Sequence, residues 1–325
     1  MRQRHGNAPR PSARRKLHKP GRRSLLAGLA LLPGCAAVAT TPARPFLEPL
    51  GALTLDTSAW GFGGFSGLHL APDLTLTAVS DLARWWRAPL ILREGLLTGL
   101  GQVRHGPLRD SAGAPLRRGT PGDAESLTRL PNGDWLVGFE RQHRILRYRD
   151  LAGPGVPFDA PPGLESAPGN GGLEGLTLLA DGRLLALAEQ LPGPAGPESR
   201  AAWLGTIQGP RVAWRPTSHI PAPGLEPTDV AALPDGGALV LERRFSWLGG
   251  FTVRLARIAP QALGGAAPLT AETWLELPPD APAENWEGVA VVQLGGRTLV
   301  ALISDDNDSR LQESLLLLYT IRTGS

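Results

Sequence analysis

The chain has 325 residues, 42% hydrophobic and 19% charged, which excludes an intrinsically disordered protein. Its 41 glycines and 32 prolines argue against a bundle of long helices, and its single cysteine excludes an internal disulfide or a multi-cysteine metal site. The net charge of +3 conceals ten Lys and Arg residues in 1–44, which leave 45–325 at −7 and argue against a nucleic-acid partner.

Residues 1–39 have the features of an export signal. A basic segment ends at Arg22-Arg23, directly before a short apolar run over residues 25–32. The run is too short for a permanent transmembrane helix, and the arginine pair resembles a twin-arginine signal. We therefore expect a protein of the periplasm or cell envelope.

Cys35 stands at the end of the apolar run, in a context that resembles a bacterial lipobox. We expect its lipidation to anchor the mature protein, with cleavage after Ala39 as the alternative. The Pro-rich segment 40–49 is expected to be a tether, and 50–325 to be the folded domain.

One pattern occurs five times after the tether. An acidic or polar residue is followed by a small residue, an apolar residue, a turn, and an apolar run that ends in an acid. Turns such as Asn132-Gly133 and Asp181-Gly182 supply the positive φ of a tight hairpin, so each repeat predicts a β-hairpin. The repeats cover residues 66–81, 125–140, 174–189, 228–242 and 287–305.

The apolar anchors of the repeats are 49 to 59 residues apart, the size of a four-stranded propeller blade. The sequence therefore predicts an all-β fold, a β-propeller with five blades. The ring would be closed by pairing of Leu50–Leu55 with the C-terminal strand over Ser314–Ile321. A sixth, degenerate blade within one of the longer intervals is the alternative.

The repeats also predict a site. In a propeller the first strand of each blade lines the central channel, so the acids before the anchors should face one mouth. Carboxylates gathered there repel one another unless a cation neutralises them, and their oxygens suit Ca²⁺, with Mg²⁺ as second choice. The predicted metal ligands are Glu125, Glu174, Asp229, Glu287, Asp305, Asp306, Asn307 and Asp308.

Arginines follow the closing acids of several repeats and suit an anionic substrate group; the candidates are Arg84, Arg141 and Arg243. His143, near Arg141, is a candidate acid or base, alongside the three glutamates among the predicted ligands. Each acid taken alone could instead be structural, bonded to backbone amides or paired with arginine. Trp247 and the pair Trp85-Trp86 could wall a pocket or pack between blades.

These residues carry a resemblance to a known family. The chain resembles the exported phytase-like proteins described as having esterase-like activity of phytase, over about residues 60–321. The motifs are Phe65-Ser66-Gly67-Leu68 with Val79-Ser80-Asp81, Asp123-Ala124-Glu125-Ser126-Leu127 with Phe139-Glu140-Arg141, Leu173-Glu174-Gly175-Leu176, Thr228-Asp229-Val230 with Leu241-Glu242-Arg243, and Trp286-Glu287-Gly288-Val289 with Ser304-Asp305-Asp306-Asn307-Asp308. The resemblance implies a β-propeller outside the cytoplasm that hydrolyses phosphate or other esters. Propeller phytases bind phytate with many lysines and arginines, whereas this chain has no lysine after Lys19, which argues against a polyanionic substrate.

Together these observations predict a monomeric, metal-assisted hydrolase of a small-molecule ester or phosphoester, which meets a membrane only through its lipid anchor. The favoured ligands of Ca²⁺ are Glu125, Glu174, Glu287 and Asp306, with Arg141 and Arg243 orienting the anion. One alternative is a non-catalytic propeller that binds a ligand or an envelope partner. Another is a propeller similar to the sugar-lactone hydrolases, which the Glu-Gly pairs at 174 and 287 would suit equally.

Overall fold

The structure of the protein, a computed structural model, describes residues 45–277, 281–282, 284–307 and 312–323. Chain contacts divide the sequence into Met1–Pro42 and Ala43–Ser325, and every described residue belongs to the second unit. The predicted export signal with Cys35, and the predicted ligand Asp308, lie outside the described residues. None of the helices in the described part is long and apolar enough to cross a membrane.

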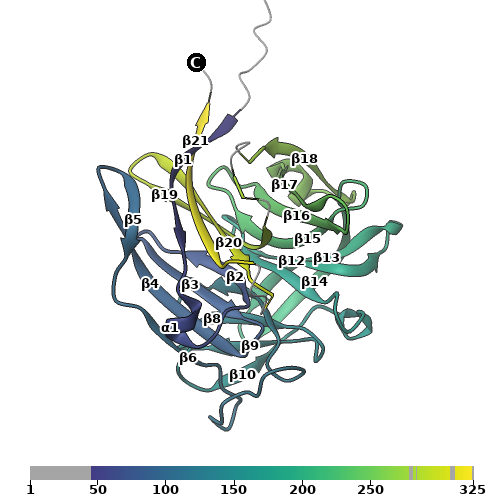
Figure 1. Ribbon diagram of the computed structural model, residues 1–325. Coiled ribbons are helices and arrows are strands. Elements are labelled where there is room, and N and C mark those ends of the chain that lie inside the picture. Colours follow the sequence, from purple (N-terminus) through teal and green to yellow (C-terminus); the bar gives the residue numbers. More distant parts are fainter. Residues whose placement is uncertain (1–44, 278–280, 283, 308–311, 324–325) are drawn as a thin grey trace, which may run out of the picture. The chain divides into compact units, whose positions relative to one another are not determined.

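The described chain is all-β, and consecutive strands pair antiparallel into four-stranded sheets (Figure 1). One sheet joins the two ends of the unit: β1 (Pro45–Thr54), β21 (Leu315–Thr323), β20 (Arg297–Asp305) and β19 (Asn285–Leu294). The next contains β2 (Phe65–Leu70), β3 (Thr75–Ser80), β4 (Arg84–Arg93) and β5 (Leu96–Leu100), with β6 (Arg104–Pro107) also paired to β4. A third contains β7 (Ala124–Arg129), β8 (Trp135–Phe139), β9 (Arg144–Tyr148) and β10 (Gly155–Phe158).

Two further four-stranded units are joined by a short parallel contact between β14 and β18. The first has β11 (Leu173–Leu178), β12 (Leu184–Gly193), β13 (Gly196–Gln208) and β14 (Arg211–Ile220). The second has β15 (Glu226–Ala232), β16 (Ala238–Ser246), β17 (Gly250–Ile258) and β18 (Leu269–Leu275). The helical segments are short: α1 (Thr57–Trp60), α2 (Pro260–Gly264) and the 3₁₀ turn η1 (Leu164–Ser166).

Each predicted repeat forms the hairpin that begins its sheet: β2–β3, β7–β8, β11–β12, β15–β16 and β19–β20. Gly133 and Gly182 have φ of 92° and 83°, as their turns require. The first repeat lacks a glycine at its turn, and Leu74 takes the positive φ there, at 64°. The hairpin predictions are confirmed.

The first strands of the sheets, which we call the inner strands, lie side by side. β2 contacts β7, β7 contacts β11, β11 contacts β15, β15 contacts β19, and β19 contacts β2. A Cβ on Gly67 would stand 2.4 Å from the backbone nitrogen of Leu127, and one on Gly288 would stand 2.7 Å from the carbonyl oxygen of Ser66. The small residue of the repeat is therefore needed because neighbouring inner strands approach to backbone contact.

The apolar residues of the described chain gather between neighbouring sheets rather than in one central core. One such cluster joins Phe65 and Trp86 of the β2–β5 sheet to Leu316 of β21. Trp86 is fully buried, so it packs between sheets, whereas the side chain of Trp247 is almost fully exposed.

The chain becomes a strand earlier than predicted, because β1 begins at Pro45 and not at Leu50. Proline lacks a backbone donor and is tolerated on edge strands, and β1 is the edge of its sheet, with a bulge between Pro49 and Gly51. The tether prediction is therefore wrong for residues 45–49. The predicted pairing with the C-terminal strand is present, with Leu53 opposite Leu316.

Candidate functional site

A pocket of about 230 Å³ lies where the inner strands begin. Its lining is mostly acidic, and we call it the acidic pocket. Two arginines, Arg141 and Arg243, also line it, together with Ser66, Asn170 and Asn307. The carboxyl groups in the lining are those of Asp81, Asp123, Glu125, Glu140, Glu174, Glu189, Glu287 and Asp305.

Bulges at the start of the inner strands position three of these acids. The pairing between first and second strand shifts between Ala124 and Ser126, between Leu173 and Gly175, and between Trp286 and Gly288. The residue inside each bulge is a glutamate: Glu125, Glu174 and Glu287 respectively. Because a bulge interrupts the alternation of a strand, it turns its side chain away from the direction that regular pairing would give.

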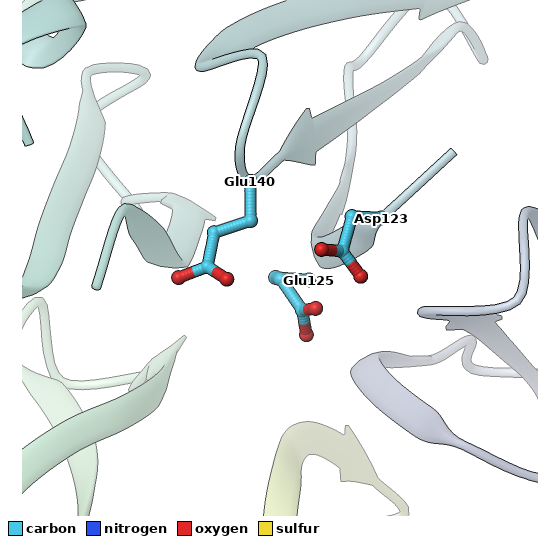
Figure 2. Close-up of side chains that lie close together, drawn as sticks. All are labelled: Asp123, Glu125 and Glu140. Atoms are coloured by element: carbon cyan, nitrogen blue, oxygen red, sulfur yellow. The ribbon is translucent and has the colours of Figure 1, made fainter. Parts of the chain in front are cut away.

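Two groups of carboxylates are close enough to share a cation. Asp123, Glu125 and Glu140 offer oxygens that lie within 4.8 Å of one another, and Figure 2 shows the three side chains close together. Glu140, Glu174 and Glu189 form a second group with the same spacing. Glu140 belongs to both groups. We call these five residues the carboxylate cluster.

Burial raises the pKa of Glu125 and of Glu174 well above the usual value. Neighbouring carboxylates add to both shifts, Asp123 acting on Glu125, and Glu125 acting on Glu174. Burial also raises the pKa of Glu189 and of Glu287 to about 7, although Arg243 partly offsets both. The pocket therefore disfavours its own negative charge and would bind a cation favourably.

The arginines of the pocket are already paired. The Nε of Arg141 lies 2.5 Å from Asp123 Oδ2, and an Nη of Arg243 lies 2.7 Å from Glu287 Oε1 and 3.9 Å from Glu189 Oε1. Among the described residues of the lining, these two positive charges are outnumbered by eight carboxyl groups.

Hydrogen bonds fix several acids in place. Glu140 Oε1 accepts from the backbone N–H of Gly172 at 2.9 Å, and Asp305 Oδ1 accepts from that of Asn307 at 2.8 Å. The side chain of Asn285 donates to Glu287 at 2.9 Å. These contacts hold the three carboxyl groups in fixed orientations around the pocket.

Two predicted ligands lie outside the acidic pocket. The carboxylate of Asp229 is buried and accepts from the backbone N–H groups of Val230, at 2.7 Å, and Val289, at 2.8 Å. The bulge of its strand holds Thr228, so Asp229 lies one position past the place that the glutamates occupy. Asp306 accepts from Ser314 Oγ at 3.0 Å, in a separate pocket with Thr57.

Arg84 and His143 also lie outside the lining of the acidic pocket. The guanidinium of Arg84 lies 4.8 Å from the centre of the Phe62 ring. His143 Nε2 donates to the carbonyl of Ala167 at 3.2 Å. The roles predicted for Arg84 and His143 therefore stay predictions.

Sequence reasoning left three members of the cluster off its list of site residues. Glu140 and Glu189 close the second strands of their repeats, and Asp123 stands two residues before Glu125. The position in the repeat would not have identified these residues, because Glu242 holds the equivalent position and is fully buried outside the acidic pocket. Glu242 bonds to His219 Nε2 at 2.9 Å and to an Nη of Arg254 at 3.0 Å.

Comparison with known proteins identifies one family. The model of a family described as "Phytase-like: Esterase-like activity of phytase" matches residues 60–308. No curated protein sequence matches the chain.

Solved structures with similar folds are β-propellers of low sequence identity. An endo-arabinase from Bacteroides thetaiotaomicron is 13% identical, with 88% of this chain and 99% of that chain covered and a TM-score of 0.48. A gluconolactonase from Xanthomonas campestris is 15% identical, with 86% and 97% covered and a TM-score of 0.47. The PQQ-bound aldose sugar dehydrogenase of Streptomyces coelicolor is 15% identical, with 86% and 100% covered and a TM-score of 0.46.

Proposed function

The chain belongs to the phytase-like family of β-propellers, and on this premise we propose that it is a metal-dependent hydrolase of ester or phosphoester bonds. The proposed site is the acidic pocket, at one mouth of the central channel. The observation that carries the proposal is the convergence of five carboxylates in two groups that share Glu140.

The cluster fits a hard divalent cation. All of its side-chain donors are carboxylate oxygens, which Ca²⁺ prefers and Mg²⁺ also accepts. We propose that Ca²⁺ is held by one of the two groups, either Asp123, Glu125 and Glu140 or Glu140, Glu174 and Glu189, with Glu140 as a ligand in both cases. When bound, a divalent cation supplies Lewis-acid polarisation of the scissile bond.

Other residues of the pocket would handle the substrate. Arg243 lies between Glu189 and Glu287 and presents a guanidinium to an anionic substrate oxygen. Glu287 lies outside the carboxylate cluster, and burial raises its pKa to about 7. A carboxyl group with this pKa can accept a proton from water and return it to the leaving oxygen at neutral pH.

Chelation tests the proposal. The protein would be purified without chelator and analysed for bound metal, and hydrolysis of p-nitrophenyl phosphate and p-nitrophenyl acetate would be followed before and after EDTA. We expect EDTA to abolish hydrolysis and Ca²⁺ to restore it, with Glu140→Gln inactive at the same Ca²⁺ concentration. If neither the melting temperature nor hydrolysis responds to EDTA and Ca²⁺, the protein is instead a non-catalytic ligand-binding propeller. A sugar-lactone substrate in the same assay separates lactonase from phosphoesterase activity.

The proposal also covers the number of blades and the closure of the ring. The cyclic contacts of β2, β7, β11, β15 and β19 support a ring of five blades, and the pairing of β1 with β21 supports its closure. We also propose that the protein is a monomer, exported to the periplasm or cell envelope and anchored there through Cys35. Mass spectrometry of the mature N-terminus tests the anchor.

A further inference from the structure

A second pocket adjoins the acidic pocket and differs from it in chemistry. It has a volume of about 660 Å³, within the usual range for small-molecule sites. Arg243, Glu287 and Asn307 line both pockets. Its other walls include Phe245, Trp247 and Phe251, and we call it the aromatic pocket.

The aromatic side chains come from the hairpin between β16 and β17. Phe245 pairs with Phe251 across the two strands, and their ring centres are 5.0 Å apart. The ring of Trp247 packs against Phe245 at 5.6 Å, near the tip of the hairpin. Trp247 is 94% exposed and Phe245 is 50% exposed. Rings exposed side by side beside a pocket indicate a binding surface, because burying them in the protein would have been more favourable.

Polar atoms at the boundary of the two pockets lack partners among the described residues. Asn285 is 2% exposed, donates through Nδ2 to Glu287, and has no hydrogen bond at Oδ1. The Nε of Arg243 is also unpaired, while its guanidinium lies 5.8 Å from the centre of the Phe251 ring. Since buried polar groups are normally satisfied, these two indicate a ligand that contacts both.

We propose that the aromatic pocket binds the ring of the substrate, and that the substrate is a monoester of an aryl or cyclic alcohol. The scissile group would lie in the acidic pocket, next to Arg243, and the uncharged ring would stack on Phe245 and Trp247. Among the residues that the structure describes, Arg243 is the cationic side chain that lines both pockets. Its single guanidinium can pair with one anionic group of a substrate, which suits a monoester. This inference depends on the proposed function in one respect, which is the placement of the scissile ester group in the acidic pocket.

Binding of non-hydrolysable ligands tests the inference separately from catalysis. Calorimetry in Ca²⁺ would compare phenylphosphonate with methylphosphonate, which differ only in the ring. We expect the phenyl compound to bind at least tenfold more tightly. Trp247→Ala and Phe245→Ala should each reduce that preference at least threefold. Phe46→Ala should preserve it, because Phe46 is also 50% exposed but lies on β1.

Equal affinity for the two phosphonates, no binding of either, or a preference unchanged in both aromatic variants would overturn the inference, even if the protein hydrolyses esters. A ring preference that depends on Trp247 and Phe245, in a protein that hydrolyses nothing, would instead support the aromatic pocket and refute the hydrolase. Trp247 is almost fully exposed, so its removal leaves folding intact.

Discussion

Replacing Glu189 with glutamine measures how strongly the acidic pocket resists its own charge. Burial raises the pKa of Glu189 from the usual 4.5 to about 7, and repulsion from Glu140 adds to the shift. Glutamine keeps the size of the side chain but has no proton to lose. Arg243 retains its closer partner, Glu287, at 2.7 Å. The substitution therefore removes one titrating group without leaving a buried cation unpaired.

The expected magnitude follows from the two pKa values. Below pH 4.5 the carboxyl is protonated in both the folded and the unfolded chain, and it adds no penalty. As the pH rises toward 7, only the folded state still holds the proton, so folding loses about 3 kcal/mol by the time the native carboxyl ionises. The Glu189→Gln variant has no carboxyl at this position and does not lose this folding free energy. Its free energy of unfolding relative to the natural protein should rise by about 3 kcal/mol between pH 4.5 and pH 8.

Other groups titrate in the same range but do not obscure the comparison. Burial lowers the pKa of His69 to about 4, so the stability it contributes is present above pH 6.5 and is lost as the pH falls toward 4. That trend opposes the trend of Glu189, but it is common to both proteins and cancels in their difference.

The assay is chemical denaturation in EDTA at pH 5 and at pH 8, with thermal melting alongside. A change of about 3 kcal/mol corresponds to a relative shift in melting temperature of roughly 6 °C. Glu165→Gln is the matched control, because Glu165 is exposed on η1 and does not line the acidic pocket. If the Glu189→Gln difference is the same at both pH values, the pocket is solvated and the electrostatic reasoning is refuted.

Three further outcomes are expected. Glu140→Gln should weaken Ca²⁺ binding at least tenfold in calorimetry, because Glu140 belongs to both carboxylate groups; unchanged affinity would exclude it as a ligand. Asp229→Asn should lower the free energy of unfolding in urea by about 2 kcal/mol, because an acceptor for backbone N–H groups is lost, and it should leave Ca²⁺ binding unchanged. A variant that loses Ca²⁺ binding but keeps its stability would contradict this expectation. Gly67→Ala should lower the free energy of unfolding by at least about 2 kcal/mol in the same denaturation, because its Cβ would overlap the backbone of Leu127. The control Gly99→Ala has open space around it and should lower that free energy by less than about 1 kcal/mol. Equal losses of stability would count against close packing of the inner strands.

The hairpins could be predicted because their signals are local. Turn residues such as Asn132-Gly133 and the apolar runs beside them specify the pairing within a dozen or so residues. The start of β1 could not be predicted in the same way. Pro45 and Pro49 are typical of a tether, and only the position of β1 at the edge of a sheet makes them compatible with a strand.

The candidate site was only partly predictable, because repetition fixes where a residue stands but not what its side chain meets. Glu125, Glu174 and Glu287 lie in the acidic pocket as the repeat predicted. Asp306 was predicted as a ligand from its place in the sequence, but its carboxylate accepts from Ser314. The carboxylate of Asp229 accepts from backbone amides instead. The repeat aligned Thr228, not Asp229, with the glutamates, and the bulge of β15 holds Thr228. Asp229 was nevertheless listed as a ligand because residue types alone do not reveal which side chain a bulge turns toward the pocket.

The repeat links the scaffold and the site through adjacent residues. Each glutamate in a bulge is followed directly by a small residue, as in Glu174-Gly175 and Glu287-Gly288. A Cβ on Gly175 would stand 2.9 Å from the side chain of Val230 on the next inner strand. The small residues thus let the inner strands approach closely, and that approach brings carboxylates from separate sheets within 4.8 Å, as with Glu140 and Glu174. The same packing that holds the sheets together therefore produces the repulsion that raises the pKa of Glu174, and with it the affinity for a cation.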